Sequence, residues 1–374
     1  MTDTDFQFGL APDDLALQRK TPYPLIPTNL RGVYANPAPP DSFDPGRASA
    51  ADLVKYGLLW PRPATTDEPA LAEAWNTVFS ARWREKDRIV PALRSQAGKT
   101  HQIRRKRRTT DGSFTSDAWA GCVFTGGLWS SVTAAWTVPT IGRLLGPRGA
   151  EGWNSTCWLS IDGFKTGRRS SCDVLQAGIE QSIDDGGEPT YTVWFAWHVP
   201  ARPSAPAYVH QTNVVNFPVD PGDTIQCYVS YANANTAGYV FVANLTRRKF
   251  TALTLAPPPG ATFRGDSIAW IVEAPNNDGL ADLPARLPPV KFTAASASGP
   301  TGVVGNPHHA DTVDIVSPDG RLLTTTTPGH FSVTVKGAPR VYRPRRGVLC
   351  LDGPLGNHSA AIAAYEPGDS CVGR

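Results

Sequence analysis

From Trp119 to Lys336, apolar and polar residues alternate in short runs that are typical of β-strands. The runs are rich in Val, Ile, Thr and aromatic residues, and Gly, Pro, Asn and Asp separate them. Because a strand places successive side chains on opposite faces, this alternation predicts sheets with one buried face. Helical periodicity is absent from the stretch. The pattern predicts an all-β domain over residues 116–337, an antiparallel β-sandwich of the jelly-roll or concanavalin-like type.

The chain before this domain has a different pattern. Residues 1–66 are rich in Pro and are expected to be irregular. Over residues 67–90 apolar side chains recur three or four positions apart, which predicts a helix. The apolar positions are Leu71, Trp75, Val78, Phe79 and Trp83. The basic block 104–108 then leads into a segment with the composition of a linker. We therefore expect a partly helical, Pro-rich N-terminal extension over residues 1–115 and a C-terminal tail over residues 338–374.

Four of the predicted strands carry an unusual second face. One face of each strand is apolar, whereas the other carries Trp, carboxylate and amide groups and no Lys. The second face includes Trp158, Asp162, Gln176, Glu180, Trp194 and Glu273. Side chains of this kind fit the floor of a binding groove. They fit equally well a half-buried face that a loop covers, and the sequence pattern leaves both readings open.

Composition and charge exclude several classes of function. No run of 18 apolar residues is present, so no membrane partner is expected, and no secretory signal is visible at the N-terminus. The net charge is only +3, and the one dense basic block has no interleaved aromatic residues, so we expect no nucleic-acid partner. Six cysteines and seven histidines show no metal-ligand spacing, and we therefore expect no metal and no cofactor.

The remaining chemistry is that of carboxylates. The sequence has no nucleophile-elbow motif and no Gly-rich phosphate loop after a strand. A Glu, whose reference pKa is about 4.3, can act as a general base toward water at acid pH. A nearby primary amide can donate hydrogen bonds to the developing oxyanion. A Gln and a Glu on one face could therefore hydrolyse an acyl bond without a metal or a covalent intermediate.

An ordered series of segments resembles the glutamic peptidases, or eqolisins, across residues 116–337. The segments are DAWAGCVF, SVTAAWTVP, CWLSIDG, VLQAGIE, YTVWFAWHVP, PGDTIQ, ANLT, SIAWIVE and VKFTAAS. The resemblance implies a sandwich of two curved antiparallel sheets and an acid-active, metal-independent endopeptidase for polypeptide substrates. It implies a catalytic dyad of Gln176, in an L-Q-T-G-like motif, and Glu273, in an E-[FW]-I-[IV]-E-like motif. Glu273 would activate a water, and Gln176 would stabilise the tetrahedral intermediate.

The same resemblance implies that a further set of side chains binds the substrate. These are Trp119, Trp158, Asp162, Glu180, Trp194 and His198. The chain also departs from the family pattern, because Ala196 and His198 replace a Glu and a Tyr of the W-Y-E-W-Y-P motif, and Ala269 replaces a Glu. The ordinary pKa of a histidine side chain is about 6.5, so we expect His198 to be cationic at acid pH.

The resemblance also implies an extracellular location and leads us to expect a monomer. Residues 1–115 lie where the family carries a basic propeptide, so they could inhibit the enzyme, with release near the basic block, or form a separate helical appendage. Three alternative functions stay open from the sequence. The protein could be a catalytically weak relative that binds peptides, a glycan-binding module, or a glycoside hydrolase that uses Glu180 and Glu273.

Overall fold

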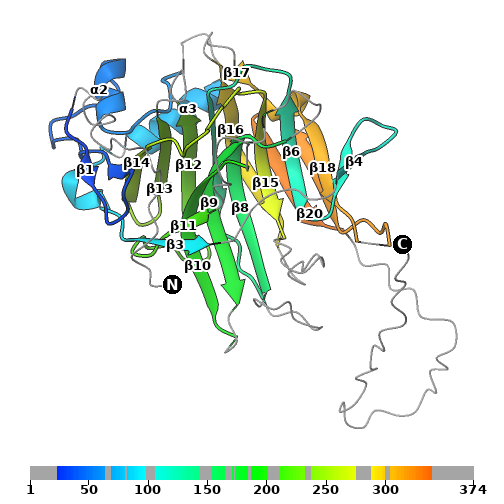
Figure 1. Cartoon of the computed structure of the whole chain (residues 1–374). Helices are drawn as coiled ribbons and strands as arrows, with labels where there is room; N and C mark the ends of the chain where they lie inside the picture. The colour runs from blue at the N-terminus through cyan, green and yellow to red at the C-terminus, as the bar shows by residue number, and fades with distance from the viewer. Residues whose placement is uncertain are drawn as a thin grey trace, which may run out of the picture. The chain divides into compact units, whose positions relative to one another are not determined.

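The computed structural model shows a β-sandwich whose two sheets are each built from ten strands. The structure describes residues 23–63, 69–80, 82–97, 106–142, 153–164, 171, 173–183, 187–200, 210–231, 237–274, 288–299, 304–317 and 319–338. The two sheets and the helices lie within one compact unit that ends at Ala338. The all-β sandwich predicted from the alternating pattern is therefore confirmed (Figure 1).

We name the first sheet sheet A. Its strands are hydrogen-bonded in the order β1-β2-β14-β13-β12-β7-β16-β20-β19, and β17 pairs with β16. Their bounds are β1 Ile26–Pro27, β2 Val33–Ala35, β7 Ser131–Thr137, β12 Thr224–Tyr231, β13 Gly238–Asn244, β14 Lys249–Leu255, β16 Val290–Ser298, β17 Val304–Gly305, β19 Thr324–Gly329 and β20 Ser332–Gly337.

The second sheet, sheet B, has the order β3-β11-β10-β9-β8-β15-β6-β18-β5-β4. Its strands are β3 Leu93–Ala97, β4 Lys106–Arg108, β5 Phe114–Ser116, β6 Trp119–Thr125, β8 Trp153–Asp162, β9 Val174–Ile183, β10 Pro189–His198, β11 His210–Val214, β15 Ser267–Glu273 and β18 Asp311–Ile315. The central pairs are antiparallel, whereas β18 and β5 run parallel.

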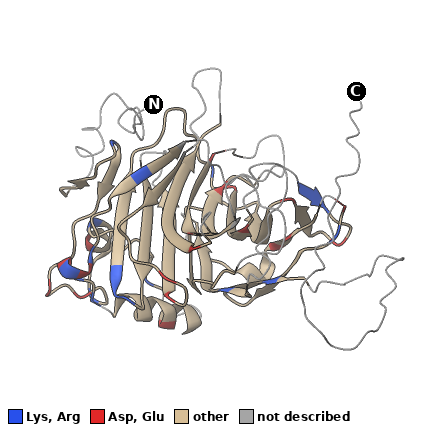
Figure 2. Ribbon diagram, turned by 90° about the horizontal axis from the view of Figure 1, so that it is seen from below, with Lys and Arg blue, Asp and Glu red and all other residues tan. Residues whose placement is uncertain are grey.

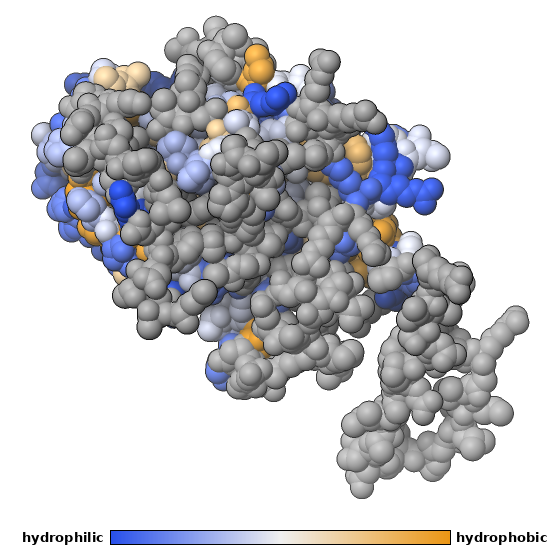
Figure 3. All heavy atoms as spheres, viewed as in Figure 1, coloured by the Kyte–Doolittle hydropathy of each residue, from blue (hydrophilic) through white to orange (hydrophobic). Residues whose placement is uncertain are grey.

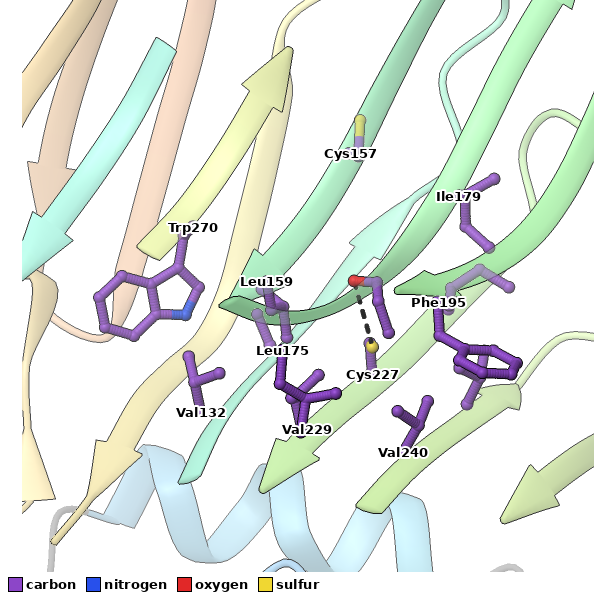
Figure 4. Packing of buried hydrophobic residues seen from close by; sticks show 14 of the residues in the cluster. Val132, Cys157, Leu159, Leu175, Ile179, Phe195, Cys227, Val229, Val240 and Trp270 are labelled. Carbon is purple, nitrogen blue, oxygen red and sulfur yellow. Dashed lines mark hydrogen bonds between the residues drawn. The ribbon is translucent and has the colours of Figure 1, made fainter. Parts of the chain in front are cut away.

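The main hydrophobic core fills the space between the two sheets. Side chains at alternate positions of sheet B, such as Leu159, Leu175 and Trp270, pack there against residues of sheet A such as Val132 and Val229 (Figure 4). Alternation places the intervening residues of sheet B on its other face, which points away from sheet A. The core therefore fixes which side chains sheet B presents on that face.

The N-terminal extension contributes helices to sheet A. Helix α2 spans Ala50–Lys55 and helix α3 spans Pro69–Phe79, and both pack on the face of β12–β14 that points away from the core (Figure 1). The helical part of the extension is therefore not a separate appendage. It also covers the opposite side of the sandwich from the second face of sheet B. Whether residues 1–115 inhibit the enzyme stays a prediction.

Helix α3 is shorter than the predicted helix over residues 67–90. It ends at Phe79 because Arg82 adopts a left-handed conformation with φ 45° and Arg84 is extended. The reversal brings the ring of Trp83 to 5.2 Å from that of Phe250 on sheet A. A single 3₁₀ turn, η1, then follows at Glu85–Asp87. Burial of Trp83 against the sheet thus replaces continuation of the helix.

Two other segments are more regular than the sequence predicted. The Pro-rich residues before position 66 contain β1, β2 and α2. The segment after the basic block, predicted as a linker, instead forms β5, and β4 pairs with it in an antiparallel hairpin. Lys106 of β4 places its Nζ 3.7 Å from the centroid of the Phe164 ring, and this contact helps to hold the hairpin on sheet B. Figure 2 shows the basic strand β4 in blue.

On the face drawn in Figure 3, the described residues that can be seen are mostly hydrophilic. Among the described residues, the exposed large apolar side chains are Val90, Leu128, Val215, Val304 and Leu322. No helix in the described ranges is long and apolar enough to cross a membrane. Cys122, Cys157 and Cys227 are buried as free thiols. The C-terminal tail over residues 338–374, apart from Ala338, lies outside the described residues.

Candidate active site

The face of sheet B that points away from sheet A is defined by Trp119, Trp158, Gln176, Trp194 and Glu273, and we call it the outer face. Its aromatic and apolar members form a hydrophobic cluster separate from the main core. The predicted polar and aromatic residues therefore do share one face, as alternation along each strand requires. The outer face is where the sequence places the candidate chemistry.

The outer face is organised in rows of residues that pair side by side across the sheet. The first row contains Ala269, Ser160, Gln176, Ala196 and Gln211. The second contains Ile271, Trp158, Gly178, Trp194 and Asn213. The third contains Trp119, Glu273, Thr156, Glu180 and Thr192. The Gln176 and Glu273 rows are four residues apart along β8, about 13 Å of strand, with the Trp158 row between them.

Glu273 ends β15 and is almost completely buried, with 2 % of its surface exposed. The indole Nε1 of Trp158 donates a hydrogen bond of 2.8 Å to Oε2 of Glu273. This bond supplies part of the hydrogen bonding that a buried carboxylate needs and fixes its orientation. The candidate base is therefore held by a side chain from the neighbouring strand.

Two more tryptophans complete the aromatic part of the outer face. Trp119 lies edge-on to Trp158, with ring centroids 4.8 Å apart and an interplanar angle of 81°. Its own Nε1 is buried without a hydrogen-bond partner in the described part of the chain. Trp194 donates from Nε1 to Oγ1 of Thr156 at 2.8 Å, next to Glu273 in the third row. Trp158 thus contacts Glu273 directly, Trp119 packs on Trp158, and Trp194 bonds to Thr156, the residue that pairs with Glu273.

Gly178 separates Trp158 from Trp194 in the second row. A Cβ at this position would lie 2.1 Å from the carbonyl oxygen of Cys157 and 2.5 Å from Cβ of Trp158. No side chain larger than hydrogen fits without moving β8 away from β9. The glycine is therefore required here by close approach of two strands, and it leaves room for the two indoles.

Gln176 lies on β9 with only 1 % of its surface exposed. Its Oε1 is buried and has no hydrogen-bond partner within the described ranges. An unpaired buried amide oxygen is costly, so in native proteins such an atom calls for a specific explanation. The group can accept a hydrogen bond from a water or from a peptide.

Asp162 has partners that differ from those expected of a substrate-binding group. Its two carboxylate oxygens accept hydrogen bonds from the backbone amides of Arg264, Gly265, Asp266 and Ser267, at 2.8–3.4 Å. Burial raises the pKa of Asp162 to about 6, against these backbone hydrogen bonds, which lower it. Three of the amides belong to the loop that enters β15, and the fourth, that of Ser267, begins the strand. Asp162 thus anchors the strand that ends at Glu273.

Glu180 is also occupied by neighbours. Ser182 donates to its Oε1 at 2.8 Å, and Gln211 of β11 donates to its Oε2 at 2.7 Å. The same Nε2 of Gln211 lies 2.7 Å from Oδ1 of Asn213. Glu180 is therefore part of a buried polar network that joins β9 to β11.

His198 is buried at the end of β10, and its Nδ1 has no partner among the described residues. Burial lowers the pKa of His198 to about 4. The expectation that this side chain is cationic at acid pH is therefore wrong above about pH 4. The physical reason is that a buried imidazole without an acidic partner loses hydration when it takes a proton.

The polar face is buried in the structure, so an open groove is not what it shows. Trp158 and Trp194 have no measurable exposure, and Gln176 and Glu273 have almost none. The described residues also contain no group of three or more His, Cys, Asp or Glu arranged to hold a metal. The sequence alternatives of a groove and a covered face are thus resolved toward burial.

A surface cavity of about 510 Å³ lies elsewhere, beside η1 and the β13–β14 turn. Its lining residues are Arg84, Lys86, Asp87, Arg247, Arg248 and Lys249. Acidic partners offset much of the positive charge, because Arg247 bonds to Asp220 and Asp223 and Arg84 lies 3.7 Å from Asp41. The cavity holds none of the predicted site residues.

Comparison with known proteins identifies the family. The model of the family described as Peptidase A4 matches residues 117–337. The chain belongs to this family. Membership in Peptidase A4 confirms the resemblance to the glutamic peptidases. It makes the protein a glutamic-type peptidase, a hydrolase of peptide bonds, and does not favour the glycan-binding and glycosidase alternatives.

The individual relatives share between 20 % and 28 % sequence identity with this chain. Aspergillopepsin-2 of Aspergillus niger is 28 % identical over 255 residues, which are 64 % of this chain and 83 % of that protein. The solved structure of aspergilloglutamic peptidase from Aspergillus niger is 26 % identical and covers 50 % of this chain and 99 % of its own, with a TM-score of 0.41. A scytalido-glutamic peptidase bound to a peptide-based transition-state analogue is 20 % identical over 59 % of this chain and 98 % of its own, with a TM-score of 0.46.

Sequence reasoning missed several residues of the outer face. Thr156 lies two positions before Trp158 on the same strand, so extending the predicted strand would have found it. Gln211 and Asn213 alternate with Thr212 and Val214 in β11, a segment that was not predicted as a strand. Gly178 lies between Gln176 and Glu180 on the same face of the strand, but its role depends on the pairing of β9 with β8, which no local pattern shows.

Proposed function

We propose that this protein is an acid-active endopeptidase in which Glu273 and Gln176 hydrolyse the peptide bond without a metal. Membership in Peptidase A4 supports peptide hydrolysis in general. The position of both side chains on the outer face supports their assignment as the dyad. Trp119, Trp158 and Trp194 are buried, so they would contact the substrate only when the outer face is uncovered, and Asp162 and Glu180 position the strands that carry the dyad.

The observation that carries the proposal is the hydrogen bond from Trp158 to Glu273. A carboxylate that is buried on an aromatic face is costly unless it is hydrogen-bonded, so its presence there calls for a function. The 2.8 Å bond holds Oε2 in one orientation. A base held in this way is ready to take a proton from a water.

Gln176 suits the second role because its amide group has both an acceptor and donors. The buried Oε1, which has no partner among the described residues, can accept a hydrogen bond from the attacking water. The Nε2–H group can donate to the oxyanion as it forms. The Gln176 and Glu273 rows are about 13 Å apart along the strands, and β9 and β15 are two strands apart, so the step requires a movement that brings both side chains within reach of one water.

The steps balance without any other reactant. Glu273 takes a proton from the water, and the water oxygen bonds to the carbonyl carbon as the C=O electrons move to oxygen. Gln176 stabilises the resulting oxyanion. The protonated Glu273 then gives its proton to the nitrogen of the leaving amine, and the C–N bond breaks to release a new carboxyl group and a new amine.

The test is digestion of a denatured protein from pH 2 to pH 7 with EDTA present. Wild type should cleave at acid pH. The Glu273→Gln variant should lose at least about 100-fold in kcat, and the Gln176→Ala variant about 100-fold, because each removes a group that acts in the transition state. Mass spectrometry of the fragments would show internal cleavage and map the preferred sites.

Two variants serve as controls. Glu73→Gln changes an exposed glutamate on α3 and should leave cleavage unchanged. Gln181→Ala removes a buried amide that bonds to Ser155 and Ile179 on the core face of β9, so it reports the effect of destabilisation alone. If Gln181→Ala lost as much activity as Gln176→Ala at a temperature where both are folded, the proposed dyad would be contradicted.

A further inference from the structure

Strand β3 lies outside the region that the Peptidase A4 model matches, yet it belongs to the candidate site. The matched region begins at residue 117, whereas β3 spans Leu93–Ala97. It pairs antiparallel with β11 over five residues and forms the edge of sheet B (Figure 1). The N-terminal extension therefore adds a strand beside those that carry the dyad.

The register of this pairing puts two polar side chains of β3 on the outer face. Gln96 pairs with Gln211, which continues the row of Gln176 and Ala196. Arg94 pairs with Asn213, which continues the row of Trp158 and Trp194. Because residues paired in a row point to the same side of a sheet, both β3 side chains share the outer face with the dyad.

The environment of these side chains is suited to a ligand. Oε1 of Gln96 is buried and has no hydrogen-bond partner in the described residues, the same situation as Oε1 of Gln176 in the same row. Arg94 is exposed and forms no ion pair within the described ranges. Between them and the dyad, Gln211 is held by its bonds to Glu180 and Asn213, and Ala196 presents only a methyl group.

We propose that Gln96 and Arg94 form an additional substrate subsite that binds an acidic side chain of the polypeptide, an inference that rests on the proposed function. The amide of Gln96 bonds to the peptide backbone, and the guanidinium of Arg94 pairs with an Asp or Glu side chain. β3 lies three strand spacings from β9, about 14 Å. An extended peptide covers this distance in about four residues, so the acidic side chain sits about four to six residues from the scissile bond.

The subsite gives the enzyme a preference for an acidic substrate residue that depends on pH. A substrate Asp or Glu is ionised only above about pH 4, whereas Arg94 stays charged throughout. The preference for an acidic residue is therefore present near pH 5.5 and absent at pH 3. Arg94 provides a carboxylate-binding group that the dyad and the tryptophans do not.

The experiment compares pairs of peptides that differ only by Asp or Asn at one position, four to six residues on either side of the cleaved bond. Wild type at pH 5.5 should cleave one Asp peptide about three- to fivefold faster than its Asn partner, the range expected of a partly exposed ion pair. The difference should vanish at pH 3 and in Arg94→Gln. Arg94→Glu should instead prefer Lys at that position.

The matched control is Arg107→Gln, which removes one exposed charge from the opposite edge of sheet B and should keep the preference. Gln96→Ala should raise KM for both peptides of a pair equally. A preference that survives in Arg94→Gln, or no preference at any tested position, overturns the subsite.

Binding to the Glu273→Gln variant separates this inference from the proposed function. Fluorescence anisotropy with labelled Asp and Asn peptides should show the same ratio, and Arg94→Gln in that background should abolish it. Selective binding that needs Arg94, without cleavage by wild type, would contradict the proposed catalysis and keep the subsite. Cleavage without selectivity that depends on Arg94 would keep the catalysis and refute the subsite.

Discussion

The indole nitrogen of Trp158 donates a 2.8 Å hydrogen bond to the carboxylate of Glu273, across 115 positions of sequence. The two residues lie on neighbouring strands, β8 and β15, in adjacent rows of the outer face. Trp158 in turn packs edge-on against Trp119, whose strand β6 pairs with β15 on the other side. Glu273 is thus oriented by one indole and enclosed by a second.

Trp158→Phe should lower kcat about tenfold or more and leave KM nearly unchanged. The change removes a hydrogen bond to a charged group, worth about 1.5–3 kcal/mol, while keeping the aromatic ring. Steady-state kinetics on a peptide substrate at the optimal pH would measure it. The control is Trp194→Phe, which removes the bond to Thr156 instead and should cost less than about threefold. Equal losses in the two variants would contradict a specific role for the Trp158 bond.

The strands of the sandwich and the faces of sheet B could be predicted from the sequence because alternation is a local property. Leu159 and Trp158 lie on opposite faces whatever their partners are. The same argument placed Gln176 and Glu273 on the outer face. Their assignment as a dyad came from the resemblance to the glutamic peptidases.

Features that depend on distant pairing could not be predicted. The row that joins Gln176 to Gln96 requires the register of three strand pairs, and β3 is a five-residue segment without a strong pattern. The end of α3 depends on packing of Trp83 against Phe250 rather than on a helix-stop signal. The depressed pKa of His198 depends on burial, which the polar identity of the residue conceals.

Gly178→Ala should destabilise the protein by about 2 kcal/mol or more and reduce activity at temperatures where it stays folded. The added Cβ would lie 2.1 Å from the Cys157 carbonyl oxygen, so β8 and β9 would have to separate, and overpacking of this kind costs about 1–3 kcal/mol. Urea denaturation would measure the free energy of unfolding. Gly337→Ala, in β20 with open space at its Cβ, is the control and should be close to neutral. A neutral Gly178→Ala would refute the close approach.

Asp162→Asn should lower the free energy of unfolding most at acid pH. The folded pKa of Asp162, about 6, lies above its ordinary value of 3.8, so its titration contributes stability that is full below pH 3.8 and is lost as the pH rises through 6. The Asn variant lacks this contribution and also loses an acceptor for the loop amides. Its deficit relative to wild type should therefore shrink by about 2–3 kcal/mol between pH 3.5 and pH 7. Urea denaturation at both pH values would measure it, and a deficit independent of pH would contradict the raised pKa.

His198→Gln should change the pH dependence of the free energy of unfolding in the direction opposite to that of Asp162→Asn. The folded pKa of His198, about 4, lies below its ordinary value of 6.5, so the unfolded chain binds a proton that the folded chain refuses between these values. Its contribution to stability is full above pH 6.5 and is lost as the pH falls toward 4. The variant should therefore gain about 2–3 kcal/mol relative to wild type on going from pH 7 to pH 4.

Thermal and urea unfolding of wild type and His198→Gln at pH 4, 5.5 and 7 would measure this gain. His308→Gln changes an exposed histidine on the 3₁₀ turn Pro307–His309 and should show no such trend. In the double variant with Asp162→Asn, the stability relative to wild type should change little with pH. The two titrations span nearly the same pH range, and their effects on the free energy of unfolding have opposite signs. The sites lie on different strands, β8 and β10, and we expect their effects to add. If wild type and His198→Gln showed the same change of stability with pH, this imidazole would be hydrated and would protonate normally.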